Sequence, residues 1–335
     1  MDRTQDCGSC NAGSIPAEST KFYMYANILI FAVSLFLIVR GATMATKYSA
    51  KLAENFRLSK YIVGFIIVTF ISILPETLIS INSALAGIPS FGLGTLFGSN
   101  VADLTLIFAI LIISAGRGIK IESSILKDIH YYPFFLLLPI ALGLDGKFSR
   151  AEGLALIIIG LIFYWLVFKN CARRPNAGSH DENGNGHWKN FFQLLFALAI
   201  LLIGSYFTVM SVVALANFLA ITPIIIGLLV VGLGTTMPEL FFSLKSLDRR
   251  GDGLAVGDIL GTVMADATIV VGLLALISPF SFPVKIIYST GMFMVAAALL
   301  LRGFMRSDRI LSKKEGYLLL LFWLAFVFTE FFLNK

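Results

Sequence analysis

The chain has 335 residues, of which 57% are hydrophobic and only 14% are charged, and its mean hydropathy is +0.86. Soluble globular domains carry about 25% charged residues, so the composition excludes a soluble protein and indicates a membrane protein. A transmembrane helix needs about 20 residues, so the chain has room for about ten helices but not for a soluble catalytic domain. The net charge of +6 comes without a basic run that contains interleaved aromatic residues. We therefore expect the cations to mark topology and not a nucleic-acid site.

Long apolar runs, taken in chain order, predict ten membrane spans. They cover residues 22–46, 60–86, 91–115, 131–144, 149–168, 191–216, 222–247, 253–278, 283–301 and 316–333. The fourth run is short and carries Pro133 and Pro139, so we expect it to be tilted or irregular. The predicted organisation is a polar tail at 1–21, a five-helix unit at 22–168, a Gly- and Asn-rich linker at 169–190 and a second five-helix unit at 191–335.

The distribution of cations predicts the orientation of the spans. With the N-terminus outside, twenty of the twenty-six lysines and arginines fall on the cytoplasmic side, including Arg40, Arg117, Lys245 and Arg302. By the positive-inside rule, both termini are expected outside the cell membrane and the central linker in the cytoplasm. The Cys7 and Cys10 pair lies in the polar tail without a βαβ pattern around it, and we expect no functional role for it.

The sequence repeats itself at an offset of 163 residues, without a gap, from Ile62 paired with Ile225 to Leu111 paired with Leu274. The matched residues include prolines, glutamates, serines, glycines and aspartates, which hydrophobic composition alone would not align. Because each unit has an odd number of spans, the second unit enters the membrane from the opposite side. The fold class predicted is an all-α polytopic membrane protein with two inverted five-helix repeats, an architecture typical of secondary transporters.

Four carboxylates of the repeat fall near the middle of their spans, namely Glu76, Asp103, Glu239 and Asp266. Burying four ionised carboxylates costs on the order of 10 kcal/mol on insertion scales. No lysine or arginine lies at a matching depth, so we expect the compensating charge to come from cations in solution. In contrast, Glu330 near the outer end of the last span lacks such company and is expected to reach the membrane interface.

Hydroxyl groups accompany these carboxylates at helical spacing. Ser72 and Thr235 stand one turn before Glu76 and Glu239, and Ser99 and Thr262 stand one turn before Asp103 and Asp266. Such stripes supply the hard oxygen ligands that suit Ca²⁺ or Na⁺. Prolines directly precede the glutamates, and a proline inside a helix frees a backbone carbonyl that can bind a cation. These prolines are Pro75 and Pro238.

Two segments carry a resemblance to a known family, Gly232-Leu-Gly-Thr-Thr-Met-Pro-Glu239 and Gly98-Ser-Asn-Val-Ala-Asp103. They resemble the α-repeats of the Na⁺/Ca²⁺ exchanger, or calcium/cation antiporter, superfamily. The resemblance implies ten helices, a central site of four ion-binding groups, and alternating access by sliding of the first and sixth helices. It implies the ion ligands Glu76, Asp103, Glu239 and Asp266. Secondary oxygens are implied at Ser72, Ser99, Asn100, Thr235, Thr236 and Thr262.

The chain departs from the family pattern at several positions that supply oxygens, such as Ile73 in place of a hydroxyl residue and Val263 in place of asparagine, and it has Asp103 where sodium-coupled members often carry asparagine. The additional carboxylate favours H⁺ coupling, because crowded carboxylates tend to share protons. The absence of the G-N-x-x-E-H signature of the H⁺/Ca²⁺ branch favours Na⁺. The resemblance therefore implies exchange of Ca²⁺, or a related divalent cation, for Na⁺, with H⁺ coupling as the alternative.

Other function classes fit the sequence less well. The P-loop pattern is absent, which argues against ATP drive. A cation channel usually builds its selectivity ring from several equivalent subunits. An intramembrane aspartyl protease needs G-x-G-D, whereas Asp258 follows Ala255-Val256-Gly257. We expect a transporter and not an enzyme, with inorganic cations and the lipid bilayer as partners, and we expect no cofactor, nucleic acid or protein partner.

Overall fold

The computed structural model describes residues 17–53, 68–121, 130–171, 187–219, 221–248, 251–307 and 309–333. Within these ranges it contains eight apolar helices long enough to cross a membrane and two shorter ones, Thr69–Leu85 and Tyr132–Asp145. The predicted class of an all-helical membrane protein and the count of ten spans are therefore confirmed. The short fourth span is a helix that contains Pro139. Cys7, Cys10 and residues 172–186 of the linker lie outside the described residues.

Each half of the chain forms a series of helices, several of which are interrupted by short π-helical or 3-10 segments labelled η. The first half contains α1 (Ala17–Ala53), α3 (Thr69–Ser72), α4 (Leu74–Leu85), α5 (Pro89–Ala102), η2 (Asp103–Ile107), α6 (Phe108–Ala115), α8 (Tyr132–Leu142), η3 (Gly143–Asp145) and α9 (Arg150–Cys171). The second half contains α10 (His187–Leu219), α11 (Pro223–Ile226), η5 (Gly227–Val231), α12 (Gly232–Thr235), α13 (Met237–Asp248), α14 (Asp252–Ala265), η6 (Asp266–Val270), α15 (Val271–Ile277), η7 (Ile287–Gly291), α16 (Met292–Ser307) and α17 (Lys313–Leu333).

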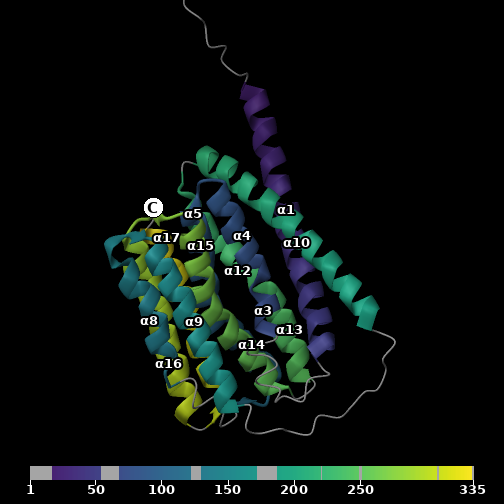
Figure 1. The fold of residues 1–335 in the computed structure, drawn as a ribbon, viewed down its shortest axis with the longest axis vertical. Helices are drawn as coiled ribbons and strands as arrows, with labels where there is room; N and C mark the ends of the chain where they lie inside the picture. The colour runs from purple at the N-terminus through teal and green to yellow at the C-terminus, as the bar shows by residue number, and fades with distance from the viewer. Residues whose placement is uncertain are drawn as a thin grey trace, which may run out of the picture.

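The long helices α1 and α10 pack against each other along one side of the bundle (Figure 1). Their contact is close because each contributes a glycine. A Cβ atom at Gly41 would lie 3.1 Å from the Ile200 side chain, and one at Gly204 would lie 3.1 Å from the Ser34 carbonyl oxygen. Gly41 and Gly204 are themselves 163 residues apart, so the two-fold pattern extends to the first and sixth spans.

The continuous helices α5–η2–α6 and α14–η6–α15 form the centre of the molecule. In an apolar stretch of 18 residues in each of these helices, 83% of the residues are buried. The corresponding shares are 28% in α1 and 22% in α17. At Gly98, an added Cβ would overlap the carbonyl group of Leu228, so α5 and η5 approach each other backbone to backbone. The two halves of the chain therefore meet directly at the centre.

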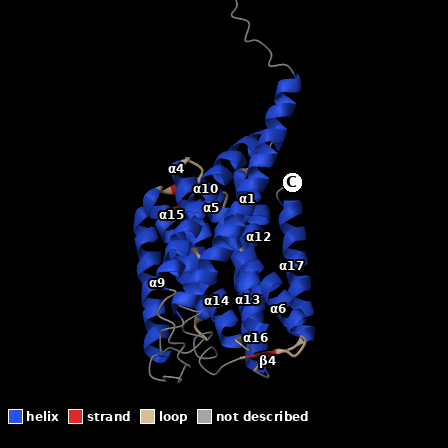
Figure 2. Cartoon of the chain, turned by 90° about the vertical axis from the view of Figure 1, so that its right-hand side faces the viewer, coloured by secondary structure: helices blue, strands red, loops and turns tan. Residues whose placement is uncertain are grey.

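Two short antiparallel strand pairs connect the ends of the helices. β1 (Ile119–Lys120) pairs with β4 (Ile310–Leu311), and β2 (Lys147–Phe148) pairs with β3 (Phe280–Ser281). Figure 2 shows β4 at the end of the bundle opposite to α4. Each pair joins a segment of the first half to a segment of the second half.

An ion pair lies next to the β1–β4 pair. The Arg117 guanidinium donates hydrogen bonds of 2.6 and 2.9 Å to the Asp252 carboxylate, which also accepts one of 3.0 Å from the Lys120 backbone N–H. The hydrogen bond to Asp252 raises the pKa of Arg117, so the guanidinium stays charged. The segment after α6 is thereby bound to the first turn of α14.

Candidate functional site

The two predicted glutamate helices are each interrupted at the predicted place. Ile73, between α3 and α4, has ψ −4°, and Thr236, between α12 and α13, has ψ −9°. Pro75 and Pro238 occupy the second position of the helices that follow, and Glu76 and Glu239 come directly after them. Because proline has no N–H to donate, the carbonyl group one turn earlier loses its helical partner.

The two predicted aspartates also occupy equivalent positions. Asp103 is the first residue of the π-helical segment η2, and Asp266 is the first residue of η6. A π segment inserts a residue into an α-helix and is frequent at functional sites. The repeat at offset 163 is therefore expressed in the backbone as well as in the residue types.

All four predicted carboxylates are buried, with no more than 1% of each residue exposed. Their side chains have buried oxygens without a hydrogen-bond partner: Glu76 Oε2 and both carboxylate oxygens of Asp103, Glu239 and Asp266. Glu76 interacts electrostatically with the other three. The buried polar residues of the described ranges include no lysine, arginine or histidine. Since buried charges normally have a partner of opposite sign, this arrangement favours bound cations or protons.

The predicted secondary oxygens are buried at the same place in the fold. Four hydroxyl groups donate their proton elsewhere, which leaves the oxygen lone pairs available to a cation. The acceptors are Asp258 Oδ1 for Ser72 (2.9 Å), and the carbonyl oxygens of Leu96 for Ser99 (3.0 Å), Gly232 for Thr235 (3.1 Å) and Leu233 for Thr236 (2.9 Å). The Thr262 hydroxyl and Asn100 Oδ1 are buried without a hydrogen-bond partner.

A fifth carboxylate, which shares a helix face with Thr262 and Asp266 in the sequence but is not among the predicted ion ligands, lies close to the site. Asp258 on α14 is fully buried, accepts a hydrogen bond from Ser72, and has a second oxygen without a partner. It interacts electrostatically with Glu76, Asp103 and Glu239. The spacing of Asp258, Thr262 and Asp266 at i, i+4 and i+8 predicts this shared face.

The five carboxylates do not form a closed metal cage. Within the described residues, no three acidic, histidine or cysteine side chains already converge on one metal position. A cation held here would therefore need hydroxyl and backbone carbonyl oxygens in addition to carboxylates, which is the mixed oxygen set that Ca²⁺ accepts.

The expectation for Glu330 was wrong. Glu330 is 0% exposed and accepts a hydrogen bond of 2.7 Å from the Thr290 hydroxyl group. The physical reason is that α17 packs against η7, which turns this side chain toward the neighbouring helix and away from the interface. A helix pattern alone does not show which face meets a neighbour.

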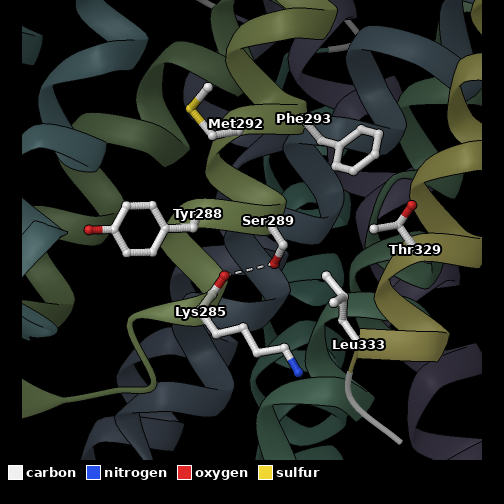
Figure 3. Close-up of a pocket in the computed structure, with 7 residues that line it drawn as sticks. All are labelled: Lys285, Tyr288, Ser289, Met292, Phe293, Thr329 and Leu333. Carbon is white, nitrogen blue, oxygen red and sulfur yellow. Dashed lines mark hydrogen bonds between the residues drawn. The ribbon is translucent and has the colours of Figure 1, made fainter.

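A separate cavity of about 360 Å³ lies between the η7–α16 helix and α17 (Figure 3). It is lined by Lys285, Tyr288, Ser289, Met292, Phe293, Thr329 and Leu333, and the Ser289 hydroxyl donates to the Lys285 carbonyl oxygen at 2.9 Å. Its lining contains a cation and no carboxylate. None of the predicted ion ligands lines this cavity.

The chain is similar to known proteins over most of its length. It is 26% identical over 262 residues to the inner membrane protein YrbG of Escherichia coli K12, which covers 75% of this chain and 79% of YrbG. It is 23% identical over 352 aligned positions to the sodium/calcium exchanger MaX1 of Methanosarcina acetivorans, which covers 92% of this chain and 99% of MaX1.

Among solved structures, the fold is similar to that of the sodium-calcium exchanger NCX_Mj, with a TM-score of 0.67 and 24% identity over 90% of this chain and 97% of that one. Two segments, residues 26–169 and 189–332, match the family model described as sodium/calcium exchanger protein. These segments include both halves of the chain and exclude the linker. The chain belongs to the sodium/calcium exchanger family of membrane cation transporters.

Proposed function

We propose that this chain is a secondary antiporter that exchanges Ca²⁺, or a related divalent cation, for Na⁺ by alternating access. The ion site would be formed by Glu76, Asp103, Glu239 and Asp266, with the secondary oxygens described above. The observation that carries the proposal is the set of buried carboxylate oxygens without a hydrogen-bond partner at the centre of the bundle. A bound cation is the group that satisfies several such oxygens at once.

The choice of a divalent cation follows from ligand chemistry. The buried groups around these carboxylates are hydroxyls, an amide oxygen and backbone carbonyls, with no histidine or cysteine among the buried polar residues of the described ranges. Hard oxygen ligands suit Ca²⁺ and do not suit soft transition metals. The sodium/calcium exchangers MaX1 and NCX_Mj, which share the family, support Ca²⁺ and Na⁺ as the pair of ions.

The two-fold arrangement supports alternating access. Equivalent helix breaks, π segments and carboxylates recur at an offset of 163 residues, and inverted repeats of this kind give two access states from one chain. The pair α1–α10 is the element we propose to slide, because only 28% of an apolar 18-residue stretch of α1 and 44% of one in α10 are buried, compared with 83% in each central helix. Residues 22–168 and 191–335 would then be the two repeat units.

The proposed orientation in the cell membrane has both termini outside and the linker in the cytoplasm. The distribution of cations supports this orientation, and the strand pairs support only the alternation of the spans, because they place residues 119–120 beside 310–311 and residues 147–148 beside 280–281. In the proposed topology residues 119–120 and 310–311 are both cytoplasmic, and residues 147–148 and 280–281 are both external. Each strand pair therefore joins loops on the same side of the membrane.

H⁺ coupling is the second candidate, and Asp103 and Asp258 favour it. Five ionised carboxylates carry five negative charges, of which one Ca²⁺ balances two. The remaining carboxylates need further cations or protons, since unbalanced charges in a low dielectric are costly.

Gradient-driven uptake tests both candidates. Purified protein is reconstituted into liposomes, and ⁴⁵Ca²⁺ uptake is measured with an outward Na⁺ gradient at fixed pH and, separately, with an outward H⁺ gradient without Na⁺. The proposal predicts uptake with the Na⁺ gradient. Uptake with the H⁺ gradient alone would indicate that Ca²⁺ is exchanged for H⁺ and not for Na⁺. Uptake with neither, in folded protein, would contradict Ca²⁺ exchange.

A further inference from the structure

Two buried tyrosines bind the helix that carries the second-half residues of the ion site. Tyr132, at the start of α8, is 1% exposed, and its hydroxyl group donates to the Leu260 carbonyl oxygen at 2.8 Å. Tyr164 on α9 is 5% exposed, and its hydroxyl group donates to the Gly261 carbonyl oxygen at 2.7 Å. These two carbonyl groups are consecutive in α14 and directly precede Thr262. Both tyrosines therefore act on the same turn of α14.

That turn lies next to the change from an α-helix to a π-helix. In an α-helix the Gly261 carbonyl accepts a hydrogen bond from the N–H of Ala265. The Tyr164 hydroxyl interacts with the Ala265 backbone as well as with Gly261. The following N–H, that of Asp266, is shared between two carbonyl oxygens, and η6 begins at this residue. The tyrosine hydroxyls therefore bind the last regular turn before the Asp266 carboxylate.

The helix that carries Tyr164 is itself packed closely against this part of the bundle. A Cβ atom at Gly153 would lie 2.7 Å from the Gly272 carbonyl oxygen on α15. One at Gly160, a turn before Tyr164, would lie 2.5 Å from the Thr268 hydroxyl oxygen on η6. Only glycine allows so close an approach. Tyr164 therefore reaches α14 from a helix with a fixed position and not from a loop.

The other repeat lacks the two hydroxyl groups. At the offset of 163 residues, Tyr132 corresponds to Val295 and Tyr164 corresponds to Val327. A valine side chain has no hydrogen-bond donor. The π segment η2 nevertheless begins at Asp103 on that side, as η6 does at its equivalent. The tyrosine hydroxyls are therefore not needed to form a π segment, and their role concerns the position of α14.

We propose that Tyr132 and Tyr164 are positioning residues of the ion site, whose hydroxyl groups hold the turn of α14 that directs Thr262 and Asp266 toward the bound cation. This inference depends on the proposed function, in which Thr262 and Asp266 supply ligand oxygens. The tyrosines act through the backbone of α14 and not as ligands. Loss of a group that orients a metal ligand typically weakens metal binding about 10–100-fold.

Equilibrium binding of ⁴⁵Ca²⁺ to the full-length protein in detergent tests this role. The variants Tyr132→Phe and Tyr164→Phe remove the hydroxyl group and keep the ring. Thr290→Val is the control for stability, because it removes another buried hydroxyl hydrogen bond, of 2.7 Å, between η7 and α17. Tyr131→Phe is the control for chemistry, because it makes the same change at a ring that is 62% exposed.

Both tyrosine variants are expected to raise the Kd for Ca²⁺ about 10–100-fold. Thr290→Val should lower the melting temperature and bind Ca²⁺ with the wild-type Kd, and Tyr131→Phe should resemble the wild type in both measurements. A wild-type Kd in either folded tyrosine variant would overturn the assignment. An equal rise of the Kd in Thr290→Val would also overturn it, because Ca²⁺ affinity would then follow stability and not the position of α14.

Amide hydrogen exchange separates this inference from the proposed function. A wild-type protein that binds no ⁴⁵Ca²⁺ would contradict the proposed exchange of Ca²⁺. In that case hydrogen exchange of residues 252–270, followed by mass spectrometry without Ca²⁺, still tests the hold on α14. These amides should exchange faster in Tyr132→Phe and Tyr164→Phe than in the wild type and in Thr290→Val. Equal exchange in all four proteins would overturn the positioning role whichever ion the protein transports.

Discussion

Replacing Gly227 by alanine should disturb the contact at which the two repeats meet. A Cβ atom there would lie 2.6 Å from the Phe91 carbonyl oxygen and 3.0 Å from the Thr95 backbone nitrogen. Both are backbone atoms of α5, so they have no rotamer change that gives way. Ordinary Cβ contacts begin near 3.4 Å, and restoring that distance from 2.6 Å requires α5 and η5 to separate by roughly 0.8 Å.

Overpacking of this size costs about 1–3 kcal/mol of stability. The effect should reach the ion site, because α5 carries Ser99 and is followed directly by Asp103, while η5 leads to Thr235 in the chain. We therefore expect Gly227→Ala to lower both the melting temperature and the Ca²⁺ affinity. Melting is followed by the loss of the monodisperse size-exclusion peak after heating, and affinity is measured by ⁴⁵Ca²⁺ binding.

The matched control is Gly303→Ala on α16, where no atom lies within 4 Å of an added Cβ. Alanine in an unobstructed helix position should leave stability unchanged or increase it by about 0.4–1 kcal/mol. If Gly227→Ala melts at or above the wild-type temperature and binds Ca²⁺ normally, α5 and η5 do not touch backbone to backbone at Gly227.

Four further substitutions test three separate parts of the structure. Arg117→Ala removes the ion pair with Asp252, and since the arginine side chain is 45% exposed we expect a loss of about 1 kcal/mol that decreases at high salt; a loss independent of salt would contradict this. Tyr132→Phe and Tyr164→Phe each remove a hydrogen bond, of 2.8 and 2.7 Å, to consecutive carbonyls of α14, and each should lower stability by about 1 kcal/mol in melting experiments; wild-type melting would argue against them. Asp103→Asn should make transport less sensitive to pH and more dependent on Na⁺, and unchanged dependence on both would exclude Asp103 from the coupling step.

The sequence predicted the parts of the fold that depend on local pattern. The apolar runs gave the ten spans, and the repeat at offset 163 anticipated the paired helix breaks before Glu76 and Glu239. These features follow from residue type and spacing within one helix, because proline breaks a helix wherever it stands in its interior.

The parts that depend on neighbouring helices were not predictable in the same way. Glu330 was assigned to the interface because its own helix offers no partner, yet Thr290, 40 residues away, binds it. The bond between Ser72 and Asp258 spans 186 residues and exists only because α3 packs against α14. Periodicity shows that a face is polar, whereas the packing of another helix decides what that face binds.

The most direct test of the account is ⁴⁵Ca²⁺ uptake into proteoliposomes under an outward Na⁺ gradient, compared for the wild type, Glu76→Gln, Glu239→Gln and Glu330→Gln. Glutamine keeps the size of the side chain and removes the charge, so the variants should fold. We expect uptake by the wild type and by Glu330→Gln, and none by Glu76→Gln or Glu239→Gln. Wild-type uptake by both site variants would contradict the claim that these buried carboxylates bind the transported ion.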